Sequence, residues 1–149
     1  MALTRIPTTT HEPLLWEYAE SKESSALVEI DDRYGLYIDG EFRAPKSRKH
    51  FPTLNPATEE ELAEVGEAGE ADVNDAVAAA RAAFTDTWGP MSGAERAKYI
   101  FRIARMIQER SRELAVLETL DGGKPIKESR DVDLPLVAGH FFYYAGWAD

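Results

Sequence analysis

The sequence has 149 residues, enough for one domain, and its 44% hydrophobic and 30% charged residues are the balance of a globular protein. A formal net charge of −10 repels phosphate backbones and anionic lipid surfaces, so we expect neither nucleic acid nor a membrane as a partner. The absence of cysteine excludes disulfides, thiolate nucleophiles and thiolate metal ligands from this chain. No apolar run approaches the roughly 18 residues of a membrane helix, and the first residues lack the apolar core of a signal peptide. We therefore expect a cytoplasmic protein.

The composition of residues 1–33 predicts an acidic, irregular amino-terminal arm, because prolines and short polar residues interrupt any periodic pattern. Leu14, Leu15 and Trp16 are the apolar exception within it. Two interpretations stay open for these residues. Either they dock the arm on another surface, or the arm is a loosely packed tail.

A small β region follows the arm. The string LYIDGEF predicts a strand, a turn at Asp39-Gly40 and a returning strand, because glycine tolerates the positive φ of a tight hairpin. HFPTLNP predicts another extended segment that ends in a turn at Asn55-Pro56, since the residue before proline avoids the helical region. ELAEV alternates apolar and polar residues and predicts a short strand.

Helical patterns occupy the rest of the chain. Gly69 is an acceptable N-cap for a first helix that stops at Gly89-Pro90. Its apolar residues recur at helical spacing and form one face: Val73, Ala76, Val77, Ala80, Ala83 and Phe84.

A second helix opens with a capping box formed by Ser92 and Glu95. Its predicted apolar face consists of Ile100, Ile103, Ala104 and Ile107. The helical pattern resumes after Ser111 and closes at Gly122-Gly123. A last helical segment starts near Ile126, and Pro135 inside it predicts a kink or a break because proline lacks a backbone donor.

No short motif in the chain carries chemistry. HEPLL lacks the second histidine of a zinc-protease helix, GGKP lacks the upstream glycine of a phosphate loop, and GEAGEAD is too acidic for a pyrophosphate. The residues alone indicate a mostly helical chain whose apolar faces exceed what its small sheet covers. The final string FFYYAGWAD is the strongest example, because termini are rarely this aromatic.

Seven strings in fixed order carry a family resemblance: YIDGEF, NPATEE, DVNDAVAAARAAF, WGPM, ERAKYIFRIARMI, ELAVLETLDGGKP and FFYYAGWAD. From about Tyr34 to Asp149 the chain resembles the amino-terminal portion of the NAD(P)-dependent aldehyde dehydrogenase superfamily. One departure is Gly122, where the family often has Asn. The resemblance implies an incomplete α/β fold, in which a β-hairpin region precedes about four helices of a Rossmann-like cofactor domain. Residues 34–149 would then be the amino-terminal part of that domain.

The resemblance also implies a mechanism for the complete enzyme. A cysteine thiolate attacks the aldehyde, hydride passes to NAD or NADP, and a glutamate-activated water hydrolyses the thioester. In the family these parts lie after the position of Asp149, so we assign no catalytic and no cofactor-binding residue to this chain. We therefore expect the chain alone to be inactive. We also expect its partner to be the remainder of the polypeptide or a complementary chain, in an enzyme that forms homo-oligomers.

The resemblance implies one binding site in this chain. In the family, backbone carbonyls before the Asn-Pro turn and an acidic side chain hold a monovalent cation. These match Thr53, Leu54 and Asp121. A cation would offset the unfavourable helix dipole at Asp121; the alternative is that Asp121 faces solvent or accepts backbone hydrogen bonds. Phe141 and Phe142 lie where relatives line a substrate entrance, although core packing is the better interpretation. A different function also stays open, a non-catalytic module that binds an aldehyde dehydrogenase chain.

Overall fold

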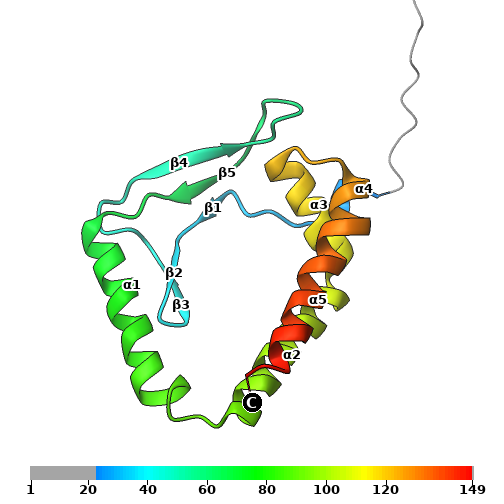
Figure 1. Cartoon of the computed structure of the whole chain (residues 1–149). Coiled ribbons are helices and arrows are strands. Elements are labelled where there is room, and N and C mark those ends of the chain that lie inside the picture. Colours follow the sequence, from blue (N-terminus) through cyan, green and yellow to red (C-terminus); the bar gives the residue numbers. More distant parts are fainter. Residues whose placement is uncertain (1–22, 149) are drawn as a thin grey trace, which may run out of the picture.

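The computed structural model describes residues 23–148, so Leu14, Leu15 and Trp16 lie outside the described residues. Strands β1, β4 and β5 lie at one end of the molecule, α1 descends on one side, and α2, α3 and α5 stand on the other (Figure 1). This arrangement confirms the α/β class, with a small β region followed by helices. Within the described residues, no helix is both long and apolar enough to cross a membrane.

Three strands form a mixed sheet in the order β1-β5-β4. Its central strand is β5 (Glu61–Gly66), which pairs antiparallel with β4 (His50–Leu54) and parallel with β1 (Arg33–Tyr34). Both strands predicted from HFPTLNP and ELAEV are therefore confirmed. The parallel pairing of β1 was not predicted, because two residues carry no detectable periodicity. The boundary of the amino-terminal arm at residue 33 stays a prediction.

The predicted hairpin consists of β2 (Leu36–Ile38) and β3 (Glu41–Arg43). Asp39 and Gly40 between them have φ angles of 58° and 81°. Two successive residues with positive φ are typical of a type I′ turn, whose twist matches that of the flanking strands. The hairpin lies between the α1 side and the α2 side of the molecule (Figure 1).

Helix α1 (Glu70–Ala83) begins at the predicted N-cap, Gly69. Asp72 in its first turn is only 2% exposed and accepts hydrogen bonds from the backbone N–H of Gly69 (2.9 Å) and of Lys46 (3.1 Å). These two donors, Gly69 first, lower the pKa of the Asp72 carboxyl below its ordinary value. The α-helical pattern ends at Ala83, and a π turn, η2 (Phe84–Trp88), extends the helix to the predicted stop at Gly89.

Helix α2 (Gly93–Glu109) begins with the predicted capping box. Ser92 Oγ accepts from the backbone N–H of Glu95 (3.3 Å), and the Glu95 carboxylate accepts from the backbone N–H of Ser92 (3.2 Å). Helix α3 (Ser111–Gly122) follows and ends at Gly123, whose φ of 71° is the left-handed conformation expected at a helix C-terminus.

The last three elements are continuous: α4 (Ile126–Glu128), a π turn η3 (Ser129–Asp133) and α5 (Leu134–Ala145). Of the two outcomes predicted at Pro135, the break is wrong, because the chain stays helical through this residue; the kink stays a prediction. The wider π turn directly before Pro135 accommodates its ring.

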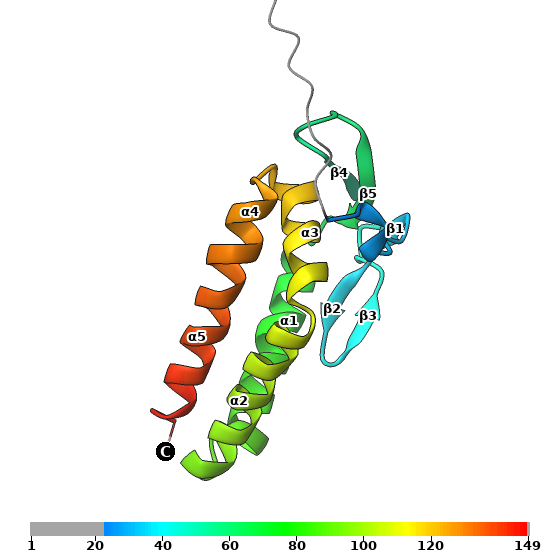
Figure 2. The same cartoon turned by 90° about the vertical axis from the view of Figure 1, so that its right-hand side faces the viewer.

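The core is small and lies mainly between α2 and α5, which run side by side (Figure 2). Ala104 of α2 is fully buried, and Ala138 and Ala145 of α5 are 2% and 4% exposed. These small residues let the two helices approach closely. Phe101 and Phe142 add an edge-on aromatic contact, with ring centroids 4.8 Å apart.

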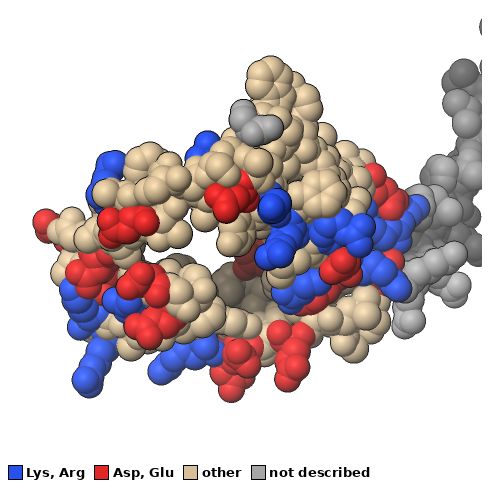
Figure 3. Space-filling view, turned by 90° about the horizontal axis from the view of Figure 1, so that it is seen from below, with Lys and Arg blue, Asp and Glu red and all other residues tan. Residues whose placement is uncertain are grey.

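Large apolar side chains remain exposed on both sides of the molecule, as the sequence predicted. On α1 they are Val73 and Val77, and on α5 and the residues after it they are Tyr143, Tyr144 and Trp147, the last 71% exposed. The space-filling view from below shows an opening between the two sides (Figure 3). The apolar faces of α1 and of α5 are therefore both available to contact another part of a protein.

Candidate functional site

The candidate site is a junction between the end of β4, the turn that follows it, and the C-terminus of α3. The turn is shaped by Asn55: its Oδ1 accepts from the backbone N–H of Ala57 (2.9 Å), and its own N–H donates to Glu60 O (2.9 Å). Asn55 O also accepts from the N–H of Glu59 (2.7 Å), which takes a positive φ of 61°. The loop between β4 and β5 therefore closes on itself.

Pro56 in this turn lies against the end of α3. A Cβ atom at Gly123 would lie 3.1 Å from Cβ of Pro56 and 3.2 Å from its Cγ. Two requirements therefore coincide at Gly123, a positive φ and a close approach of the Asn-Pro turn.

Thr53 and Asp121, which are 68 residues apart, meet at this junction. Thr53 Oγ1 donates a hydrogen bond of 2.5 Å to Asp121 Oδ1. The pairing of β4 with β5 is irregular between Thr53 and Leu54, so the regular hydrogen-bond ladder is interrupted there. Leu54 is about half exposed.

Asp121 has no basic partner among the described residues: between residues 23 and 148, no Lys, Arg or His forms an ion pair with it. The nearest basic residue in sequence, Lys124, instead pairs with Asp133, and this contact raises the pKa of the Lys124 ammonium. Asp121 is also in the last turn of α3, where the helix dipole disfavours a carboxylate. The junction thus brings together the side-chain oxygens of Thr53 and of Asp121, a carboxylate with which no basic side chain of residues 23–148 pairs.

Such a set of donors suits a hard cation better than zinc. In the part of the chain that the structure describes, no three His, Asp or Glu side chains are placed to hold a metal ion together. The two side-chain oxygens that meet here, Thr53 Oγ1 and Asp121 Oδ1, are of the type that binds alkali and alkaline-earth ions instead.

Two helix N-termini are capped by side chains of their own first turn. At α1 the backbone N–H of the N-cap Gly69 donates to the buried carboxylate of Asp72, and at α2 the N–H groups of Ser92 and Glu95 belong to the capping box. Helix α5 continues from η3 without a separate N-terminus. That this chain holds no cofactor-binding residue stays a prediction.

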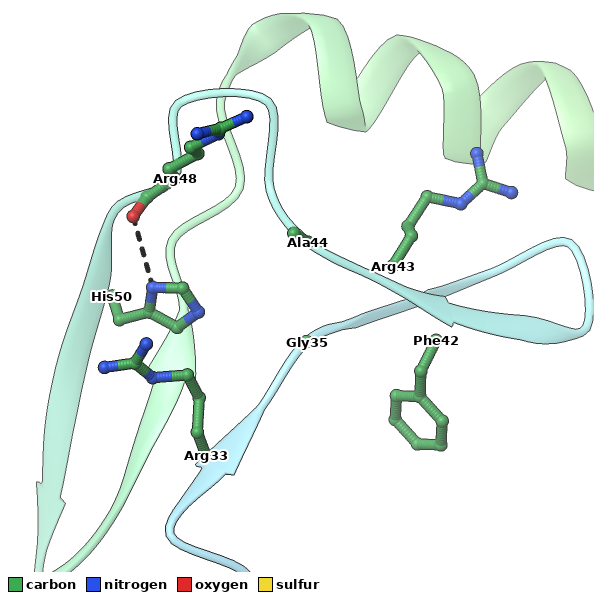
Figure 4. Close-up of a pocket in the computed structure, with 7 residues that line it drawn as sticks. All are labelled: Arg33, Gly35, Phe42, Arg43, Ala44, Arg48 and His50. Carbon is green, nitrogen blue, oxygen red and sulfur yellow. Dashed lines mark hydrogen bonds between the residues drawn. The ribbon is translucent and has the colours of Figure 1, made fainter.

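A hollow of about 610 Å³ lies between the mixed sheet and the β2–β3 hairpin and is lined by residues from both, among them Arg33, His50 and Phe42 (Figure 4). Its basic residues are mostly engaged within the protein. Arg33 pairs with Glu64, Arg43 donates to the carbonyl of Ile38 (2.9 Å), and His50 Nδ1 lies 3.3 Å from Arg48 O. We assign no chemistry to this hollow.

The two weak candidates for a substrate entrance occupy different environments. Phe142 is partly buried and packs on Phe101, whereas Phe141 is 36% exposed. The packing of Phe142 accounts for its apolar character, and a role for either residue at an entrance stays a prediction.

Comparison with known proteins gives a family for this arrangement. Residues 42–149 match the family model described as the aldehyde dehydrogenase family. Over 115 residues the chain is 47% identical to aldehyde dehydrogenase family 2 member B4, mitochondrial, of Arabidopsis thaliana, covering 76% of this chain and 21% of that protein. It is 44% identical over 115 residues to benzaldehyde dehydrogenase, mitochondrial, of Antirrhinum majus, covering 76% and 22%.

The fold agrees with the same family. The structure matches that of an aldehyde dehydrogenase from Bacillus cereus in complex with NAD+, with a TM-score of 0.75 and 46% sequence identity. The match covers 77% of this chain and 24% of that one. The chain therefore spans about a quarter of the length of the relatives that it matches.

Proposed function

The chain belongs to the aldehyde dehydrogenase family, and we propose that it is the amino-terminal part of an enzyme that oxidises an aldehyde to a carboxylic acid with NAD or NADP. The observation that carries this proposal is the family match over residues 42–149 together with the matching fold. We propose no particular aldehyde as the substrate, because relatives with similar sequence identity to this chain are named after different aldehydes. A cytoplasmic location is part of the same proposal.

The contribution of this chain is structural. It has no cysteine, so the thiolate that attacks an aldehyde in this family must come from other polypeptide. We propose that the residues that bind the cofactor likewise belong to other polypeptide, as the family resemblance implies. We therefore assign to it the framework on which the remaining parts of the enzyme pack.

The exposed apolar faces support this role. Val73 and Val77 of α1, and Tyr143, Tyr144 and Trp147 at the end of α5, are each more than half exposed. Full burial of one such side chain contributes about 1.5–3 kcal/mol. We propose that the remainder of the polypeptide, or a complementary chain, covers both faces, and that the complete enzyme is a homo-oligomer.

A dehydrogenase assay tests the framework role. The pure 149-residue chain, supplied with an aldehyde and NAD or NADP, is expected to produce no reduced cofactor, and a full-length relative serves as the positive control. Production of reduced cofactor by the pure chain would overturn the proposal that the nucleophile lies elsewhere.

We further propose that Thr53, Leu54 and Asp121 hold a monovalent cation, Asp121 through its carboxylate and the other two through backbone carbonyls. The support is the Asp121 carboxylate beside Thr53, with which no basic side chain of residues 23–148 pairs, and the interrupted ladder at Leu54. The melting temperature is expected to be higher in potassium chloride than in choline chloride at equal ionic strength. Asp121→Asn should remove this difference, and Asp86→Asn, at an exposed carboxylate remote from the junction, should keep it. Equal behaviour of the two variants would contradict the site.

A second function, a non-catalytic module that binds an aldehyde dehydrogenase chain, rests on the same exposed faces. The two proposals differ in what accompanies the chain. If the chain is a binding module, it should co-purify in stoichiometric amount with a separate full-length enzyme. If it is part of an enzyme, it should be found joined to, or in complex with, only the missing portion.

A further inference from the structure

Glu23, the first residue that the structure describes, forms hydrogen bonds with arginines of two helical elements, α3 and η3. Glu23 Oε2 accepts from Arg112 Nε (3.1 Å) and Nη2 (2.8 Å), and its Oε1 accepts from Arg130 Nη1 (3.1 Å). The Glu23 side chain is only 8% exposed. Hydrogen bonds from Arg112 and then Arg130 also lower the pKa of the Glu23 carboxyl. Residues before Glu23 therefore leave from a fixed point, beside the start of α3 and the π turn η3.

A groove lies between α2 and α5 and offers an apolar floor with a basic rim. Its volume is about 570 Å³. Ala97 and Phe101 of α2 and Phe142 of α5 line the floor, and Lys98 and Arg102 stand on the α2 side. Phe101 is 50% exposed although its ring packs on Phe142, so the aromatic pair is covered on one side only. Ala145 and Gly146, which lie between Tyr144 and Trp147 in the sequence, line the groove as well.

We propose that the groove between α2 and α5 is occupied by this chain's own amino-terminal arm, through Leu14, Leu15 and Trp16. The sequence EPLLWEYAE at residues 12–20 combines large apolar side chains with three glutamates and has no Lys or Arg. A large aromatic such as Trp16 suits a floor made of two phenylalanine rings.

The charges of arm and groove are complementary, although the chain as a whole is acidic. Lys98 and Arg102 of α2 line the groove, no acidic residue lines it, and α5 carries no Lys, Arg, Asp or Glu. The three glutamates of residues 12–20 would thus meet two basic side chains in this groove. Opposite charges at a rim favour one partner and one orientation more than they raise affinity.

The arm is long enough to reach the groove. Arg130, which holds Glu23, and Phe142 in the groove are twelve residues apart on a continuous helical run, so they are separated by about 18 Å at the helical rise of about 1.5 Å per residue. Leu14 to Trp16 precede Glu23 by seven to nine residues, which span about 23–30 Å when extended at about 3.3 Å each. Because the arm is tethered at Glu23, its effective concentration at the groove is high and a modest affinity suffices.

Disulfide trapping tests the docking directly, since the chain has no native cysteine. Leu15→Cys is combined with Ala97→Cys in the groove, and the control combines Leu15→Cys with Val132→Cys. Val132 is 55% exposed and lies only two residues from Arg130, nearer to the anchor than the groove is. In a glutathione buffer, docking predicts at least about fivefold more intramolecular disulfide for the Ala97 pair than for the Val132 pair. Circular dichroism of the reduced variants verifies that each one folds.

Two results would overturn the proposal. The first is a yield of intramolecular disulfide for the Val132 pair that equals or exceeds the yield for the Ala97 pair, because an arm without a docking site has no preference for the groove. A disulfide-linked dimer as the main product of the Ala97 pair shows that the groove takes the arm of a second copy instead.

A charge reversal supplies an independent measurement. Lys98→Glu, added to the Ala97 pair, is expected to lower the yield of intramolecular disulfide about threefold or more. The matched control is Arg105→Glu, at an α2 residue that pairs with Glu109 and does not line the groove. An equal effect of both reversals would contradict the assigned charge complementarity.

Discussion

Gly123 gives the sharpest test of how the candidate junction is built. Replacing it with alanine adds one methyl group at a position with φ of 71°, 3.1 Å from Cβ of Pro56. The neighbouring Gly122 is the matched control, because it is the last residue of α3 and a Cβ there would meet nothing within 4 Å. The two variants differ only in which of two adjacent glycines gains the methyl group.

We expect the two substitutions to change the unfolding free energy in opposite directions. For Gly123→Ala, the left-handed conformation costs about 1–2 kcal/mol, and the displacement of Pro56 adds to that loss. For Gly122→Ala, removing a flexible residue from a helix stabilises the fold by up to about 1 kcal/mol. We therefore expect the unfolding free energies of the two variants to differ by about 1–3 kcal/mol.

Urea denaturation followed by circular dichroism measures both free energies under one condition. A lower midpoint for Gly123→Ala and an unchanged or higher midpoint for Gly122→Ala agrees with the structure. Equal stability of the two variants would refute the reasoning, because it would mean that neither the positive φ nor the contact with Pro56 constrains the junction.

Further predictions concern the caps and the core. The pKa of Asp72 lies below its ordinary value of 3.8, so the stabilisation by its carboxylate is present above pH 3.8 and is lost as the pH falls through the lower pKa of the folded state. Asp72→Asn should therefore make the unfolding free energy depend less on pH across that acidic range. An unchanged pH dependence would contradict the buried capping role. Ser92→Ala should destabilise the fold by about 1 kcal/mol in urea titrations, since it removes the side-chain acceptor of the α2 capping box. Ala104→Leu should cost about 1–3 kcal/mol because Ala104 is fully buried between α2 and α5, whereas Ala94→Leu, at an exposed position, should be neutral; equal thermal stability of the two leucine variants would argue against that packing.

Local patterns predicted most of the elements because their causes are local. Asp39-Gly40 specified a hairpin turn, Ser92 and Glu95 specified the start of α2, and Gly123 specified the end of α3. In each case a few neighbouring residues satisfy or restrict the backbone by themselves, so no tertiary information is needed.

Features that depend on distant parts of the chain were not predicted from local pattern. The parallel pairing of Arg33 with Glu64 and the contact of Pro56 with Gly123 each join residues far apart in sequence. The break expected at Pro135 was wrong for a related reason, since the π turn before it accommodates the ring within a helix that packs against α2. Thr53 and Asp121 were singled out by family resemblance alone, and their hydrogen bond could not be inferred from periodicity.

The size of the protein in its natural source tests the central claim most directly. If this chain is the framework of a larger aldehyde dehydrogenase, intact mass and native size should show a polypeptide, or a stable complex, several times larger than 16.6 kDa. The exposed faces of α1 and α5 would then be covered in that assembly. A lone monomer of 16.6 kDa, stable without any partner, would contradict the account.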